Sequence, residues 1–261
     1  MSLPRSRRRR RRWLLRGLLV FAVPLIAAVA LAIEVELAIH GTNLANDGRF
    51  LLDRVVGGGS GPVLRVTWLG DSTAAGVGAS RPATALPRVV ADALAAALGR
   101  PVELTVLAVT GARVDDVLHR QVGRVPAATD LVVVDVGSND VTHLTPVADF
   151  RRRYRTLLDQ LPHRAKVVLL GVPDMGAVTR FAQPLRAIAG WRGRTVDREV
   201  VHLARDRRLG YVDIAGKTGP SFRRHPGRYL AVDHYHPSDD GYRLWADAVV
   251  PVTEEVVRAG P

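Results

Sequence analysis

The chain has 261 residues, of which 47% are hydrophobic and 24% charged, a composition that is typical of a globular protein and excludes a disordered one. It contains no cysteine, which excludes disulfide bonds and thiolate metal sites. The formal net charge of +12 includes eight arginines among residues 1–16, which hold no acidic residue, so the remainder carries only +4. The excess charge therefore belongs to the N-terminus and does not favour a nucleic-acid-binding domain.

An apolar segment, residues 13–33, follows the basic run directly and is interrupted by a single arginine. Residues 17–33 carry no charge and would form a helix about 25 Å long, near the lower limit for crossing a bilayer. The arginines before this segment, with Glu34 and Glu36 after it, orient the N-terminus toward the cytoplasm by the positive-inside rule. We therefore expect residues 1–40 to form a basic N-terminus with a membrane anchor or signal helix, and the rest to lie on the extracytoplasmic side.

Other interpretations of this segment stay open. Small-x-small sequences at 28–30 and 30–32 suit cleavage of a secretory signal, after which the protein would be secreted. Residues 11–16 (Arg-Arg-Trp-Leu-Leu-Arg) loosely match a twin-arginine export signal. A buried soluble helix is the remaining alternative, and the arginine-rich flank argues against it.

The segment from 41 to 61 is predicted to be a flexible linker. Asn43 and Asn46 interrupt the preceding helical pattern, and residues 57–61 read Gly-Gly-Gly-Ser-Gly. We expect the remainder, residues 62–261, to form one domain.

Within 62–261, short apolar runs alternate with helical patterns, which predicts an α/β fold with a parallel sheet covered on both faces. The expected architecture is a three-layer α/β/α, flavodoxin-like fold with a five-stranded, mostly parallel sheet. The predicted strands are 63–70, 102–109, 131–136, 166–170 and 211–214, and the predicted helices are 84–98, 112–122, 147–161, 185–208 and 239–257.

Chemically distinctive residues follow the predicted strand ends. The first strand ends in Gly70-Asp71-Ser72, Gly111 follows the second, and residues 137–140 (Gly-Ser-Asn-Asp) follow the third. Residues 233–237 (Asp-His-Tyr-His-Pro) precede the last helix. Because the carboxyl ends of parallel strands share one edge of a sheet, a hydroxyl, a backbone donor, a carboxamide and an Asp/His pair are expected to converge there. These groups are the components of acyl transfer through a covalent intermediate.

From Val63 to the C-terminus, the chain resembles the SGNH (GDSL) hydrolase family. The resemblance rests on four blocks that occur in the family's order: Gly70-Asp71-Ser72, Gly111, Gly137-x-Asn139-Asp140 and Asp233-x-x-His236. Each block alone is weak, whereas all four in order, each after the appropriate element, are specific.

The resemblance implies that Ser72 is the nucleophile, His236 the general base and Asp233 the group that orients His236. The chemistry supports these roles, because a serine hydroxyl is a poor nucleophile until an imidazole takes its proton. An aspartate three residues before the histidine can also accept from Nδ1–H and leave Nε2 facing the serine.

The resemblance also implies an oxyanion hole made of the backbone N–H groups of Ser72 and Gly111 and the side-chain amide of Asn139. Glycine lets the backbone approach a substrate closely, and a neutral carboxamide can donate to a developing alkoxide. Asp71 and Asp140 are expected to play supporting roles. An ordinary Asx turn is the structural alternative for Asn139 and Asp140.

Met175 and Phe181 belong to an apolar segment, residues 171–191, that follows a strand end. They are candidates for lining an acyl-binding pocket, and the alternative is that they only pack against the following helix. His234 and His236 form His-x-His beside Asp233. No third ligand stands at a suitable spacing, so no metal is expected.

The sequence therefore predicts an exported serine esterase that hydrolyses a lipid acyl or O-acyl carbohydrate ester through an acyl-serine intermediate. No cofactor and no nucleic acid are expected, the membrane is contacted through the N-terminal helix, and the catalytic domain is taken to be a monomer. One alternative is an acyltransferase acting on cell-envelope glycan or lipid. Another is a non-catalytic, SGNH-like module that binds the envelope.

Overall fold

In the computed structural model, the described residues are 52–259, preceded by the single positions Ala22, Val29, Ile33, Glu36, Leu44 and Phe50. Six strands in this part of the chain form one sheet, in the order β1-β3-β2-β4-β5-β6. The strands are Arg54–Val56 (β1), Leu64–Gly70 (β2), Val102–Val106 (β3), Leu131–Asp135 (β4), Lys166–Leu170 (β5) and Gly210–Val212 (β6).

Strands β2 to β6 run parallel to one another. β2 lies between β3 and β4, and β5 and β6 follow on the side of β4. The first parallel strand thus lies between the second and the third, which is the flavodoxin-like order. The sequence-based prediction of an α/β fold is confirmed, but the described sheet has six strands and not five.

The additional strand, β1, pairs antiparallel with β3 at the edge of the sheet. It has three residues and lies in the stretch predicted to be a linker. Val56 in the strand and Leu52, two residues before the strand begins, are buried, whereas Val55 is 60% exposed. So short a run carries too little alternation to be distinguished from a loop by its pattern.

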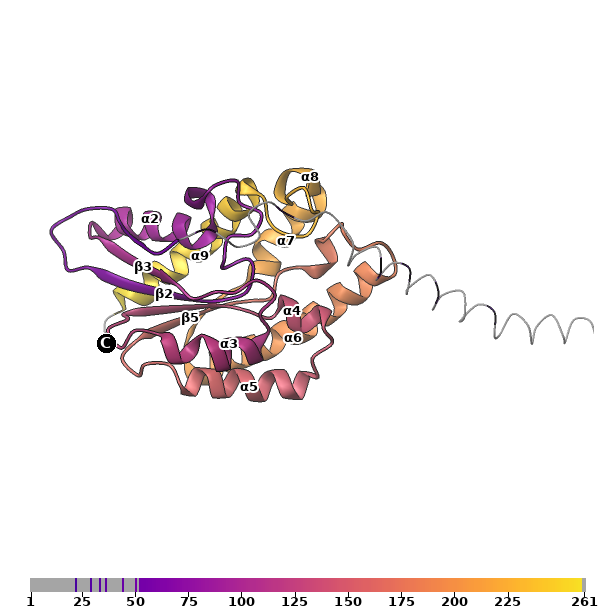
Figure 1. The fold of residues 1–261 in the computed structure, drawn as a ribbon, viewed down its shortest axis with the longest axis horizontal. Coiled ribbons are helices and arrows are strands. Elements are labelled where there is room, and N and C mark those ends of the chain that lie inside the picture. Colours follow the sequence, from indigo (N-terminus) through magenta and orange to yellow (C-terminus); the bar gives the residue numbers. More distant parts are fainter. Residues whose placement is uncertain are drawn as a thin grey trace, which may run out of the picture.

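Alternate residues of the central strands enter two separate cores. In β4, Leu131 and Val133 belong to one hydrophobic cluster, and Val132 and Val134 belong to the other. Figure 1 shows α2 and α9 on one face of the sheet and α3 and α5 on the other. The bounds of the helices are Leu86–Leu98 (α2), Val114–Arg120 (α3), Ser138–Thr142 (α4), Val147–Asp159 (α5), Leu185–Arg207 (α6), Ile214–Arg224 (α7), Pro226–Tyr229 (α8) and Asp239–Arg258 (α9).

The start of α9 is tied to the segment that follows β2. The helix is capped by Ser238, whose hydroxyl accepts from the backbone N–H of Gly241. Asp239 accepts from the backbone and the hydroxyl of Ser80 and from the hydroxyl of Thr84. These bonds join residues that are 155 and 159 positions apart in sequence.

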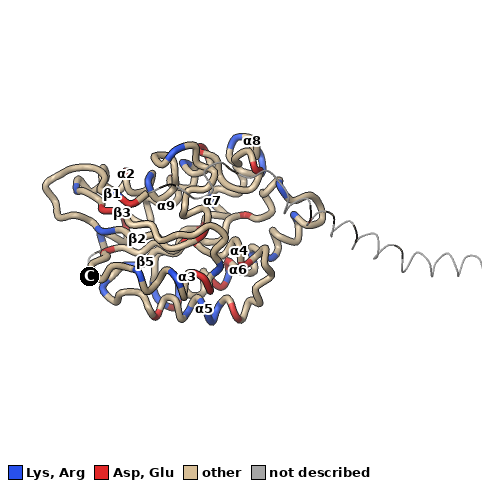
Figure 2. Tube along the Cα trace, viewed as in Figure 1, with Lys and Arg blue, Asp and Glu red and all other residues tan. Residues whose placement is uncertain are grey.

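Charged residues lie mainly on helices and loops, and the strands carry few of them, as Figure 2 shows. This distribution is expected for a sheet that is buried on both faces. Among the described residues, no helix combines the length and the apolar character that crossing a bilayer requires. The predicted anchor or signal helix in residues 1–40 lies outside the described residues, apart from four single positions.

Candidate active site

Loops at the carboxyl edge of the parallel strands carry the side chains that the sequence singled out. The segments concerned are 71–79 after β2, 107–113 after β3 and 136–140 after β4. The loop 230–237, which precedes α9, reaches the same edge and is closed at its base by a bridge between its first and last residues. This edge is where ligands bind in open α/β sheets.

Ser72, His236 and Asp233 form a continuous chain of hydrogen bonds. His236 Nε2 lies 2.9 Å from Ser72 Oγ, and His236 Nδ1 lies 2.6 Å from Asp233 Oδ2. Asp233 Oδ1 accepts from the backbone N–H groups of Tyr235 and His236. Burial raises the pKa of Asp233, but the hydrogen bond and charge of His236 outweigh burial and hold this pKa below its ordinary value. An ionised Asp233 keeps the proton on Nδ1 and leaves Nε2 to accept the serine proton.

The segment after β2 holds Ser72 against this imidazole. The backbone N–H of Val77 donates to the carbonyl of Ser72, and the hydroxyl of Tyr242 in α9 donates to the carbonyl of Val77. Gly78 has φ +98°, and a Cβ atom there would stand 2.3 Å from the carbonyl oxygen of Pro237. Glycine at this position therefore allows the segment 71–79 (the serine loop) and the segment 230–237 (the histidine loop) to touch.

The backbone N–H groups of Ser72 and Gly111 have no acceptor among the described residues. Gly111 has φ +80°, and nothing lies within 4 Å of the position that a Cβ atom would take. A ligand oxygen can therefore approach the Gly111 amide closely, and both amides are available as donors.

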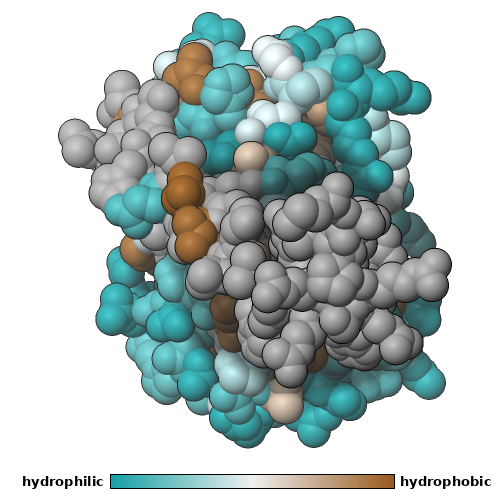
Figure 3. Space-filling view, turned by 90° about the vertical axis from the view of Figure 1, so that its right-hand side faces the viewer, coloured by the Kyte–Doolittle hydropathy of each residue, from teal (hydrophilic) through white to brown (hydrophobic). Residues whose placement is uncertain are grey.

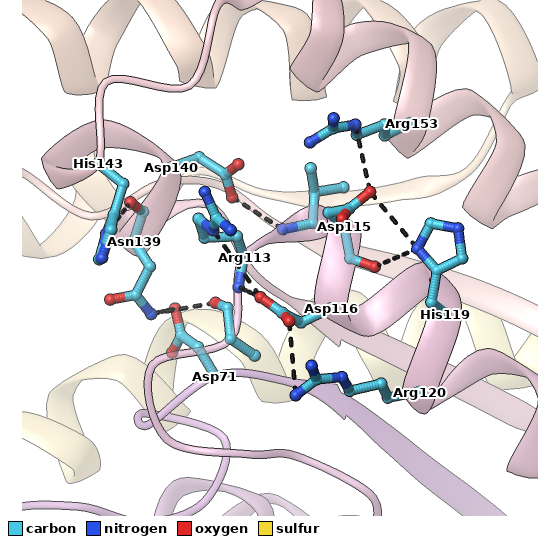
Figure 4. A network of polar contacts seen from close by, with 12 residues as sticks. Asp71, Arg113, Asp115, Asp116, His119, Arg120, Asn139, Asp140, His143 and Arg153 are labelled. Atoms are coloured by element: carbon cyan, nitrogen blue, oxygen red, sulfur yellow. Dashed lines mark hydrogen bonds and ion pairs between the residues drawn. The ribbon is translucent and has the colours of Figure 1, made fainter.

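The side-chain amide of Asn139, in α4, is the third donor at this edge. Its Nδ2 donates to the carbonyl of Ala112 at 3.0 Å and to Asp71 Oδ2 at 3.4 Å, and Figure 4 shows the amide directed toward Asp71. The first bond holds the amide beside the Gly111 loop. The second is long and therefore weak.

Asp140, the neighbour of Asn139, is fully buried and acts on the structure of the loop. Its Oδ2 accepts from the backbone N–H of Val114 at 2.9 Å, at the first residue of α3 (Figure 4). Burial raises the pKa of Asp140, and the bond from Val114 acts in the opposite direction. The contact fixes the end of the Gly111 loop relative to α4.

Asp71 is one of three buried polar residues that sequence reasoning did not recognise as a cluster. The hydroxyl of Thr73 lies 2.9 Å from Asp71 Oδ1 and 2.8 Å from Asp135 Oδ2. Burial raises the pKa of Asp71 to about 6, and burial together with the charge of Asp71 raises the pKa of Asp135 to about 8. Thr73 and Asp135 are separated by 62 positions, so no sequence spacing indicated that they meet.

Gln121 was missed for the same reason. Its buried side chain accepts from the backbone N–H of Gly70 and donates to the carbonyl of Gly70, both at 2.8 Å. This pair of bonds satisfies the backbone immediately before Asp71 and Ser72. Gln121 follows the last residue of α3, and no sequence motif marks a glutamine there as a partner of Gly70.

A pocket beside Ser72 and His236 has an empty volume of about 500 Å³, part of which is open to solvent. Met175 lines it, as the sequence suggested, whereas Phe181 does not; Phe181 packs edge-to-face on Tyr235, which does line the pocket. Most of the lining is apolar. Further apolar lining residues are Val178, Phe222, Leu230 and Trp245.

His234 is exposed, and its backbone N–H donates to the carbonyl of Ala231. Within the described part of the chain, no three His, Cys, Asp or Glu side chains are grouped so that they could hold a metal ion.

Comparison with known proteins gives a consistent set of relatives. A family model described as "GDSL-like Lipase/Acylhydrolase family" matches residues 68–244. The chain is 31% identical over 211 residues to the GDSL-like esterase Rv1075c of Mycobacterium tuberculosis, a match that covers 75% of this chain and 66% of that relative.

Solved structures with the same fold include the lipase Lip_vut3 from a goat rumen metagenome, with a TM-score of 0.61 and 19% identity, covering 75% of this chain and all (100%) of that one. Phospholipase A1 from Streptomyces albidoflavus NA297 has a TM-score of 0.54 and 23% identity, covering 74% of this chain and 98% of that one. At these identities the likeness concerns the fold.

Proposed function

Because the chain belongs to the GDSL-like lipase/acylhydrolase family, whose members hydrolyse ester bonds, we propose that it is a serine esterase with Ser72 as its nucleophile. The observation that carries the proposal is the 2.9 Å contact between Ser72 Oγ and His236 Nε2, continued by the 2.6 Å contact to Asp233. A nucleophile, a base and the group that orients the base are the minimum for acyl transfer through serine.

In this mechanism, Nε2 of His236 takes the proton of Ser72 as the hydroxyl oxygen attacks the ester carbonyl. The imidazolium then gives that proton to the leaving alcohol, and an acyl-serine remains. His236 next takes a proton from water, whose oxygen attacks the acyl carbonyl; the imidazolium then returns that proton to Ser72 Oγ as the acid leaves. Asp233 stays ionised throughout and stabilises the imidazolium.

The negative charge on the carbonyl oxygen would be received by three donors. The N–H groups of Ser72 and Gly111 are already unpaired within the described chain, and Asn139 can exchange its 3.4 Å contact with Asp71 for one with the substrate. The contact with Ala112 would remain and hold the amide in place. Donors arranged in advance need little reorganisation when the charge develops.

Replacing Ser72 by alanine tests the assignment. The Ser72→Ala variant of the full chain should fold, have no measurable turnover of p-nitrophenyl butyrate and take no label from a fluorophosphonate probe. A non-catalytic binding module would show no serine-dependent labelling even in the unchanged protein. Turnover by the folded variant at the rate of the unchanged protein would refute the assignment.

The acyl part of the substrate would lie in the apolar pocket beside Ser72. Met175, Val178 and Trp245 provide surfaces for a hydrocarbon chain, and such surfaces favour an acyl group longer than acetyl. Turnover of p-nitrophenyl acetate, butyrate, octanoate and palmitate should therefore rise from acetate to at least butyrate. A maximum at acetate would instead favour removal of acetyl groups from carbohydrate.

We also propose that the protein is exported and tethered by residues 1–40, with the domain on the extracytoplasmic side. The support is the run of arginines followed by 17 uncharged residues. The described chain reaches the domain at Phe50, whose ring lies 3.6 Å from the position that a Cβ atom on Gly76 would take. Gly76 belongs to the serine loop, so Phe50 lies beside this loop.

A further inference from the structure

Thr73 makes two contacts that its single hydroxyl proton cannot satisfy alone. Its oxygen lies 2.9 Å from Asp71 Oδ1 and 2.8 Å from Asp135 Oδ2. A hydroxyl donates one hydrogen bond, and an ionised carboxylate donates none. If both carboxyl groups were ionised, one of them would face a lone pair of the hydroxyl oxygen. A proton on one of the two carboxyl groups removes this conflict.

The surroundings of the two carboxyl groups differ in the number of donors. Asp71 also accepts from the backbone N–H of Thr73 at 3.0 Å and from Asn139 Nδ2 at 3.4 Å. Among the described residues, the hydroxyl of Thr73 is the one hydrogen-bond partner of the Asp135 carboxyl group. An anion is stabilised by donors, so the negative charge belongs on Asp71.

The groups around the two carboxyl groups also bear on which of them carries the proton. Tyr154 of α5 and Tyr242 of α9 lie near Asp135, and both are neutral phenols with raised pKa values, caused first by burial. His236 and Asp140 lie near Asp71; the charge of His236 lowers the pKa of Asp71, and the charge of Asp140 acts in the opposite direction but is the smaller of the two effects. Asp135 is only 4% exposed, and among the described residues the charged group that acts on it is the Asp71 carboxylate and not a cation. Burial without a cation favours the neutral acid.

We infer that Asp135 is a protonated positioning residue that acts on Asn139 through Thr73 and Asp71. The proton of Asp135 is donated to Thr73 Oγ, the proton of Thr73 is donated to Asp71 Oδ1, and Asp71 remains an anion. This inference rests on the proposed function, in which Asn139 donates to the oxyanion.

The arrangement selects one orientation of the Asn139 amide. An anionic Asp71 attracts the NH₂ group of Asn139 and repels its carbonyl oxygen, so the donor and not the acceptor is held near the catalytic centre. A second anion at Asp135 would draw the Thr73 proton away from Asp71 and loosen this arrangement. The relay also joins the loop after β2 to the end of β4, and these are the strands whose ends carry Ser72 and Asn139.

The location of the proton can be measured without turnover. Infrared difference spectra of the full chain should contain the carbonyl band of a protonated carboxyl group at neutral pH, which disappears on titration through about pH 8. The Asp135→Asn variant should lack this titrating band, because an amide does not ionise. A control is Asp197→Asn, which removes a half-buried carboxyl group, bonded to Tyr211, and should leave the band in place. Absence of the band, or its persistence in Asp135→Asn, would overturn the inference.

The action on Asn139 is measured by kinetics of Thr73→Val. This variant should lower kcat for p-nitrophenyl butyrate by about 10-fold, less than removal of an oxyanion donor itself, with KM changed little. Thr73→Ser, which restores the hydroxyl, should recover most of kcat. The control Thr253→Val removes a buried hydroxyl that bonds only within α9 and should leave kcat unchanged.

The outcomes separate this inference from the proposed function. A chain whose activity depends on Ser72, but whose Thr73→Val variant behaves like Thr253→Val, would refute the relay alone. A chain that shows the carboxyl band but whose turnover does not depend on Ser72 would refute the esterase. If Thr73→Val does not fold, the infrared comparison of the unchanged chain with Asp135→Asn still decides where the proton lies.

Discussion

Asn139 has two amide protons, and both are engaged before a substrate arrives. One bond, to the carbonyl of Ala112, is 3.0 Å long, and the other, to Asp71, is 3.4 Å long. The difference in length gives the two bonds different roles, since the shorter one holds the side chain and the longer one can be exchanged for a developing oxyanion. Asp233 shows the same division of roles, because one oxygen binds His236 Nδ1 and the other accepts backbone N–H groups.

Replacing Asn139 by alanine should lower kcat by about 100- to 1,000-fold, the usual loss for one oxyanion donor, with a smaller change in KM. Labelling by a fluorophosphonate should become slower but persist, because Ser72 and His236 are untouched. The labelling rate is measured by stopping the reaction at successive times, and kcat and KM are measured by steady-state kinetics. An unchanged kcat in the folded variant would remove Asn139 from the oxyanion hole.

The stability of the protein should fall as pH rises through the range in which Asp135 is protonated in the folded state and ionised in the unfolded state. Its pKa is about 8 when folded, against an ordinary value of 3.8, so between these values the folded chain holds a proton that the unfolded chain has lost. The contribution is complete below the ordinary pKa and is lost as pH rises to about 8. Urea unfolding of Asp135→Asn should show a flatter dependence on pH over this window. An equal slope in both proteins would contradict the raised pKa.

At the scale of elements, the catalytic edge depends on contacts between loops that belong to different strands and helices. The serine loop touches the histidine loop at Gly78, and α9 holds the serine loop through Tyr242 and the residue that follows this loop, Ser80, through Asp239. Gln121, at the end of α3, binds both backbone groups of Gly70. The edge strand β1 pairs with β3, the strand that precedes the segment 107–113 with Gly111.

A chain that begins at Pro62 should be less stable than one that begins at Phe50. The shorter chain lacks Leu52 and Val56, both almost fully buried, and each such side chain contributes about 1.5–3 kcal/mol. We expect a loss of about 3 kcal/mol or more in the free energy of unfolding, measured with urea. Equal midpoints for the two chains would show that β1 is dispensable.

At the scale of the whole molecule, several exposed apolar side chains lie in or near the segments that carry the proposed site. Figure 3 views the molecule from the right-hand side of Figure 1, the side of α4, and hydrophobic residues come to the surface there among hydrophilic ones. Leu144, Trp191 and Val232 are 66%, 61% and 71% exposed, and they belong to the Asn139 region, α6 and the histidine loop. Exposed apolar residues of this kind agree with the proposed ester substrate that carries a hydrocarbon acyl group.

The proposed tether predicts where the protein is found. The full chain, expressed in a bacterium, should remain with the membrane fraction after a high-pH wash, whereas a chain that begins at Phe50 should be released. The domain of the full chain should be cleaved by a protease added outside spheroplasts, because the arginines retain the N-terminus in the cytoplasm. Recovery of the full chain in the medium with a shortened N-terminus would favour a cleaved signal instead.

The sequence by itself determined the α/β class and the approximate bounds of five strands and five helices, because these depend on local periodicity and on turn residues. It also directed attention to Ser72, Gly111, Asn139 and the Asp233–His236 pair, which the structure brings to one edge. Only the tertiary structure decided that β1 joins the sheet, that Met175 and not Phe181 lines the pocket, and that Thr73 lies between Asp71 and Asp135. A three-residue edge strand leaves almost no periodic signal. A hydrogen bond between side chains 62 positions apart leaves none, because it depends on how the strands are ordered in the sheet.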